Sequence, residues 1–143
     1  MSSAQTNAAL ARSIYQLFSE NRFDEVLALT TEDVEVMCIP FDRAFHGREG
    51  LRIFMQELKS TFPDMCITTI IHQVATDDEV VNEFKARGAH MGLLITPAGA
   101  VPPTGRTVEL MVCAVCSIRD GKLASLRNYQ DVASILRQLG VVA

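Results

Sequence analysis

Residues 106–130 read RTVELMVCAVCSIRDGKLASLRNYQ. The first part, residues 106–119, is rich in the β-branched and apolar residues that favour strands. Asp120-Gly121 then gives the two-residue signal for a tight hairpin turn, and residues 122–130 follow as the returning strand. This stretch predicts a long antiparallel hairpin.

The chain around this hairpin adds more strands and a last short helix. The predicted elements are strands at residues 65–76 and 80–95, a turn at 77–78, a Pro- and Gly-rich loop at 96–105 and a helical turn at 132–138. The C-terminal half is therefore predicted to be a run of antiparallel strands.

The first half of the chain is predicted to be mainly helical. Helices are expected at residues 7–20, 23–29 and 48–61, with one strand at residues 34–39. Leu10, Ile14 and Leu17 recur at the spacing of one helical face. Helices followed by antiparallel strands are typical of an α+β fold, expected here as a single domain over residues 1–143. A curved sheet that hides its apolar face under these helices forms a cone with a natural pocket inside.

Composition excludes several classes of function. The formal net charge is −4, and no basic stripe with interleaved aromatic residues is present, so nucleic acid is not an expected partner. The first residues lack the basic and apolar segments of a signal peptide. The longest apolar run, residues 110–116, is far shorter than the ~20 residues that span a bilayer. A cytoplasmic protein without a membrane partner is expected.

The spacing of Cys113 and Cys116 raises the question of a metal or redox site. Both lie in a predicted strand, and strand residues three apart point to opposite faces. The two sulfur atoms therefore cannot share one metal ion, and no second pair of ligands is present. Buried free thiols are expected instead, with no metal.

Five short stretches resemble one known superfamily, in the right order over residues 8 to 140. They are Phe45-His46-Gly47-Arg48-Glu49-Gly50, Phe62-Pro63-Asp64, Gly88-Ala89-His90-Met91-Gly92, Pro103-Thr104-Gly105-Arg106, and Asp120-Gly121-Lys122 with the ending Gln138-Leu139-Gly140. The chain resembles the nuclear-transport-factor-two-like superfamily, and within it the SnoaL-like polyketide cyclase or ester cyclase group. This resemblance implies the curved cone and a hydrophobic small-molecule ligand.

The resemblance also implies a chemistry from which this chain departs. Polyketide cyclases of the group close a ring by an intramolecular aldol reaction without a metal or organic cofactor, and a buried aspartate serves as general acid/base. That aspartate falls on Asn128, and a histidine of the preceding strand falls on Ala114. An amide donates and accepts hydrogen bonds but does not titrate, so Asn128 cannot shuttle a proton.

Several residues are candidates for the missing proton transfer. His90, on the inward face of its predicted strand, is either an acid/base or a structural hydrogen-bonding group. Asp131 either replaces the absent acid or caps the following helical turn. Asp42 and His46, four apart in the loop after Pro40, either form an acid/base pair at the mouth of the cone or are unrelated. Asn128 would polarise a carbonyl group or be a satisfied amide of the core.

Four residues are candidates for contacts with the ligand: Tyr15, Phe41, Phe84 and Ala114. Tyr15 either lines the pocket or packs in the core with its hydroxyl at a rim. Phe41 lies in the loop at the predicted mouth. Phe84 shares a strand face with His90, and Ala114 takes the place of the family's histidine.

Two functions follow from this pattern. One is a cofactor-independent cyclase, isomerase or dehydratase (a lyase) acting on a hydrophobic, carbonyl-bearing metabolite. The other is a module that binds a small molecule or dimerises without chemistry, as the loss of the acidic residue suggests. A homodimer through the open sheet face is expected in either case, because residues 111–116 leave both faces of their strand apolar.

Overall fold

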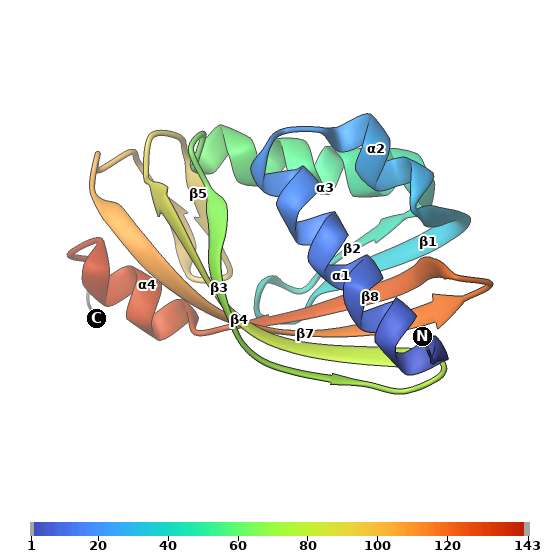
Figure 1. Ribbon diagram of the computed structural model, residues 1–143. Coiled ribbons are helices and arrows are strands. Elements are labelled where there is room, and N and C mark those ends of the chain that lie inside the picture. The colour runs from blue at the N-terminus through green and yellow to red at the C-terminus, as the bar shows by residue number, and fades with distance from the viewer. Residues whose placement is uncertain (1, 142–143) are drawn as a thin grey trace.

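The computed structural model describes residues 2–141, in which helices lie over one face of a strongly curved sheet (Figure 1). The helices are α1 (Ser3–Ser19), α2 (Phe23–Ala28), α3 (Gly47–Thr61) and α4 (Val132–Gln138), with a 3-10 turn, η1, at Ile39–Phe41. The strands are β1 (Thr30–Cys38), β2 (Arg43–His46), β3 (Cys66–Ala75), β4 (Glu79–Ala89), β5 (Leu94–Thr96), β6 (Gly99–Val101), β7 (Thr107–Arg119) and β8 (Lys122–Gln130). The predicted α+β cone is confirmed.

The main sheet is built outward from the β7–β8 hairpin. Its order is β2-β1-β8-β7-β4-β3, and β3, β4, β7 and β8 pair antiparallel as predicted. β1 pairs with β8 in parallel, with Val36 opposite Leu126, so the sheet is mixed. The antiparallel partner of β1 on its other side is β2.

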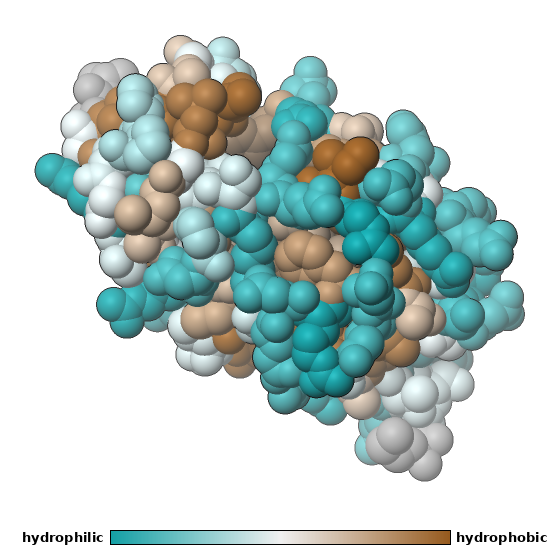
Figure 2. Space-filling view, turned by 90° about the horizontal axis from the view of Figure 1, so that it is seen from above, coloured by the Kyte–Doolittle hydropathy of each residue, from teal (hydrophilic) through white to brown (hydrophobic). Residues whose placement is uncertain are grey.

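The three N-terminal helices cover the concave face of the sheet (Figure 1). α1 packs against β3 and β4, and α3 packs against β1 and β2. α1 begins earlier than predicted because Ser2 and Gln5 form a reciprocal capping box at its N-terminus. Figure 2 shows the molecule from above, where hydrophilic side chains dominate and hydrophobic ones show in patches between them.

Other stretches also differ from the sequence-based prediction, and β1 begins at Thr30 rather than at residue 34. The strand expected at residues 80–95 ends at Ala89, and the loop expected at 96–105 contains the small β5–β6 hairpin. The break follows from tertiary contacts: the backbone N–H groups of Met91 and Gly92 both donate to the Thr61 carbonyl at the end of α3. β2 was expected to be loop, and its backbone is held by pairing with β1.

The inside of the cone is apolar, and alternate residues of β4 and β7 are buried there. Cys116 is buried and Cys113 is half-buried, with neither in a disulfide, as expected for two free thiols. Among residues 2–141, no helix is long and apolar enough to cross a membrane.

Candidate functional site

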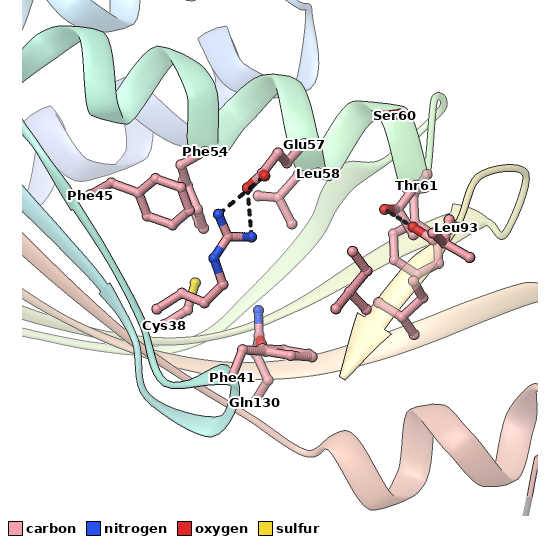
Figure 3. Close-up of a pocket in the computed structure, with 14 residues that line it drawn as sticks. Cys38, Phe41, Phe45, Phe54, Glu57, Leu58, Ser60, Thr61, Leu93 and Gln130 are labelled. Atoms are coloured by element: carbon pink, nitrogen blue, oxygen red, sulfur yellow. Dashed lines mark hydrogen bonds and ion pairs between the residues drawn. The ribbon is translucent and has the colours of Figure 1, made fainter. Parts of the chain in front are cut away.

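An outer cavity of about 270 Å³ lies between α3, β2 and the β5 strand (Figure 3). The rings of Phe41, Phe45 and Phe54 form much of its wall. Arg43 and Glu57 bring charge to the same wall. The cavity therefore offers an aromatic surface with one ion pair.

An inner cavity of about 80 Å³ lies deeper, between α1, α3 and the concave face of the sheet. Phe54, Leu58 and Gln130 line both cavities, so the two adjoin. The inner lining is otherwise almost wholly apolar, with polar atoms from Tyr15 and Asn128. Apolar cavities with a few convergent polar groups are the usual form of small-molecule sites.

Asn128 lies on β8 with its side chain in the inner cavity. Its neighbours across the sheet are Ala114 on β7 and Cys38 on β1. The residue is 8% exposed, and its Oδ1 atom is buried without a hydrogen-bond partner among the described residues. Buried polar groups are nearly always paired, so this oxygen is free to bind a ligand.

Gln130 is a second amide on the same face of β8, two residues further along. Its Oε1 atom is also buried and unpaired among the described residues. Its position in both cavities makes it a boundary residue between them. Sequence reasoning missed Gln130, although the strand alternation that places Leu126 and Asn128 inward places Gln130 there as well.

Tyr15 extends from α1 into the inner cavity, with its ring centroid 4.7 Å from that of Phe84. Burial raises the pKa of the Tyr15 hydroxyl well above 10.0, and the nearby Cys116 adds to the rise. Asn82 and Cys116 lie close to this hydroxyl, but neither makes a well-aligned hydrogen bond with it. Tyr15 therefore lines the cavity with a neutral side chain, and its hydroxyl lies near Asn82 and Cys116, which are not among the residues that line this cavity.

The other predicted ligand contacts are distributed between the cavities and the core. Phe41, in η1, lines the outer cavity, and Phe84 lines the inner one. Ala114 is fully buried beside Asn128 but is not among the residues that line either cavity.

The ion pair of the outer cavity joins β2 to α3. Arg43 Nη1 lies 3.1 Å from Glu57 Oε2, and Arg43 Nη2 donates to Glu57 Oε1 at 3.2 Å. The Arg43 guanidinium also lies 4.8 Å from the centre of the Phe45 ring. Neither charged residue was singled out from the sequence. Figure 3 shows Glu57 and Gln130 on opposite sides of this cavity.

His90 is fully buried and lies outside the residues that line the two cavities. Its Nδ1 atom accepts from the Thr104 backbone N–H at 3.2 Å, and the Thr104 hydroxyl oxygen lies 3.0 Å from the same atom. The His90 backbone is bonded to Gly105 and Arg106. These contacts tie the end of β4 to the loop before β7.

The remaining acid/base candidates lie at the surface. Asp131 is the N-cap of α4, where its Oδ1 accepts from the Ser134 backbone N–H at 3.1 Å. Asp42 directly precedes β2 and His46 is its last residue, so about 13 Å of extended strand separates them, and the structure does not bring them together. His46 instead faces Glu35 at 3.4 Å.

This combination of a curved sheet, covering helices and an apolar interior is the nuclear-transport-factor-two-like fold. A proposed polyketide cyclase from Xanthomonas campestris pv. campestris superposes with a TM-score of 0.83 at 23% identity, covering 96% of this chain and 99% of that one. An NTF2-like protein from Burkholderia xenovorans LB400 gives 0.73 at 19% identity, covering 95% and 97%.

The particular family follows from the sequence as a whole. The family model for SnoaL-like polyketide cyclases matches residues 8–139, so the chain belongs to that family. IdmH, a proposed polyketide cyclase from Streptomyces antibioticus, shares 26% identity with a TM-score of 0.79, covering 94% of this chain and 99% of that one. No curated protein matches the chain. These findings confirm the resemblance seen in the five sequence stretches.

Proposed function

We propose that the chain is a cofactor-independent enzyme of the cyclase or isomerase type, which binds a small hydrophobic metabolite with an enolisable carbonyl group. One observation carries the proposal: the amide oxygens of Asn128 and Gln130 are buried and unpaired at the adjoining cavities. An unpaired buried acceptor costs about 1–3 kcal/mol, which a ligand hydrogen bond would recover. Family membership supports the same reading.

The polar atoms indicate the chemistry of the ligand. The amide oxygens of Asn128 and Gln130 accept from a hydroxyl group, and their N–H groups donate to a carbonyl oxygen. The enol form of a 1,3-dicarbonyl compound carries both groups, and the apolar walls favour a hydrophobic remainder. In this arrangement the side-chain N–H groups of Asn128 and Gln130 stabilise developing negative charge on oxygen, and neither side chain transfers a proton.

The proposal is tested by binding of 2-acetylcyclohexanone, a hydrophobic and largely enolised diketone, measured by calorimetry. Asn128→Leu keeps the side-chain size and removes the polar atoms, so affinity should fall about tenfold or more, the loss expected for one hydrogen bond of ~1.5 kcal/mol. Ile53→Ala, at an exposed site on α3, is the matched control. Equal affinity of wild type and Asn128→Leu contradicts the proposal.

A non-catalytic binding module is the alternative, and one observation favours it. Among the described residues that line the inner cavity there is no carboxylate and no imidazole. A module of this kind would bind the diketone but turn over none of a panel of polyketide-like esters and enols. The roles expected for His90, Asp131, Asp42 and His46 stay predictions that the same panel can test by substitution.

We also propose a homodimer through the convex face of the sheet. Ile71, Val74, Met111 and Tyr129 are 44%, 50%, 36% and 42% exposed on β3, β7 and β8. Exposed apolar patches of this kind mark protein interfaces. Val74→Lys with Met111→Lys should shift sedimentation equilibrium from dimer to monomer, whereas Met91→Lys, away from this face, should not. A monomeric wild-type chain contradicts the proposal.

A further inference from the structure

The proposed reaction needs a group that removes a proton from carbon, and few side chains at the cavities can do so. The inner cavity offers only the Tyr15 hydroxyl, whose raised pKa keeps it protonated. In the outer cavity, burial raises the pKa of the Cys38 thiol to about 11, so it is protonated as well. Arg43 is a permanent cation. Glu57 is the one carboxylate among the described residues that line either cavity.

We infer that Glu57 is the proton-transferring residue of this site, acting on the carbon next to the carbonyl group of a hydrophobic ketone. The inference rests on the proposed function. Glu57 takes the place of the acid that the family's pattern would put at position 128, but it does so from α3, on the other wall of the cavity.

The position of Glu57 on α3 places it near the junction of the two cavities. It lies three residues after Phe54 and directly before Leu58, and both of these line the inner and the outer cavity. Residues three and four apart share one side of a helix, so Glu57 and Phe54 face the same space. Gln130, the third residue of the junction, lies across from Glu57 (Figure 3).

Arg43 is the positioning residue for this carboxylate. Its two terminal nitrogens contact the two oxygens of Glu57 separately, at 3.1 and 3.2 Å, which fixes the plane of the carboxylate. The Phe45 ring against the guanidinium restrains Arg43 in turn. Each carboxylate oxygen keeps a lone pair for a proton, since an ionised carboxylate has about four acceptor sites.

The proton-transfer step balances without any other reagent. A Glu57 oxygen takes the proton from the carbon next to the carbonyl, the C–H bond breaks, and its electron pair forms the C=C bond of an enolate. The Gln130 amide N–H donates to the enolate oxygen. In a cyclisation, the enolate carbon then bonds to a second carbonyl carbon of the same molecule, and that carbonyl oxygen takes the proton from Glu57. In an isomerisation, the proton returns to a different carbon.

The experiment follows exchange of the α-protons of 2-tetralone, a hydrophobic bicyclic ketone, for deuterium in D₂O by NMR. Wild type should catalyse the exchange, and Glu57→Gln should lower kcat/KM by about 10²–10⁴-fold, as for the loss of a general base. The Kd of 2-tetralone, measured separately by calorimetry, should stay the same. Glu25→Gln breaks a comparable surface ion pair, with Arg22, and serves as the matched control.

Arg43 gives a second readout that a purely structural role would not produce. Arg43→Met should lower kcat for exchange with little change in KM, and Arg43→Lys should restore part of kcat. Glu57→Asp, which retracts the carboxylate by one methylene, should retain some exchange above that of Glu57→Gln.

The possible results separate this inference from the proposed function. If 2-tetralone binds and exchange is the same in wild type and Glu57→Gln, or absent in both, Glu57 is not the proton-transferring group although the ligand site stands. If wild type binds neither 2-tetralone nor 2-acetylcyclohexanone, both proposals are overturned. If it binds 2-acetylcyclohexanone but not 2-tetralone, only the inference about Glu57 is overturned. Loss of exchange in Glu57→Gln with unchanged Kd supports the assignment.

Discussion

At the residue scale, Asp131 has a carboxylate that could take part in catalysis but forms a hydrogen bond with the backbone of a helix. It stands between β8 and α4 and accepts a hydrogen bond from the Ser134 backbone N–H, the geometry of a helix N-cap. The carboxylate is exposed and lies outside the residues that line the cavities. Its polar oxygen therefore stabilises the first turn of α4.

Replacement of Asp131 should separate the capping role from a catalytic one. Asp131→Ala should lower the free energy of unfolding by about 1 kcal/mol, measured by urea denaturation, because the first turn of α4 loses its acceptor. Asp131→Asn keeps an acceptor oxygen and should retain most of the stability. A stable Asp131→Asn protein that has lost turnover would instead assign the carboxylate to the reaction.

The sequence predicted part of the candidate site at this scale. Strand alternation was enough to direct Asn128 inward, because period 2 depends only on local backbone geometry. The Arg43–Glu57 pair could not be found in this way, since the residues lie on different elements and meet only when α3 packs beside β2. The exclusion of His90 from the cavities also depends on a tertiary contact, its bond to Thr104.

At the element scale, the early end of β4 is set by the packing of its last residues against α3. The sequence predicted one long strand over residues 80–95, although this stretch contains Gly88 and Gly92, because a glycine within a strand is only a weak signal for a break. The structure shows that Gly92 lies so close to the Ser60 carbonyl oxygen that a β-carbon at this position would overlap it. The absence of a side chain at Gly92 permits the contact that turns the chain into β5.

Gly92→Ala should therefore destabilise the protein and distort the outer cavity. The expected loss is about 2 kcal/mol or more in the free energy of unfolding, in the range of mutations that force packed elements apart. Gly105→Ala is the control: its φ is +73°, but an added β-carbon meets open space, so only the backbone cost of about 1–2 kcal/mol applies. If Gly92→Ala has the same free energy of unfolding as the wild type, the end of α3 and the segment before β5 can move apart at little cost.

At the scale of the whole molecule, the buried thiols make the stability of the fold sensitive to alkaline pH. Burial raises the pKa of Cys116 from 9.0 to about 12 and that of Cys38 to about 11. Between pH 9 and these values the unfolded chain loses the thiol protons while the native chain keeps them. The native state then binds more protons than the unfolded state, so stability falls as the pH rises.

This effect predicts a measurable slope in urea denaturation between pH 8 and pH 10.5. Cys116 alone should cost about 2 kcal/mol by pH 10.5, at ~1.4 kcal/mol for each pH unit above 9. Cys116→Ala should be less stable at pH 8 because of the space left behind, but its stability should decline less steeply. An identical slope in both proteins would show that the Cys116 thiol does not titrate this way.

The parallel pairing of β1 with β8 also determines when the sheet can form during synthesis of the chain. The ribosome releases β1 well before β8, yet Val36 is fully buried beside Leu126. Long-range contacts of this kind slow folding and leave apolar surface uncovered while the nascent chain grows. Until β8 is made, one edge of β1 has no partner, so the cone cannot close around its interior before residues 122–130 have left the ribosome.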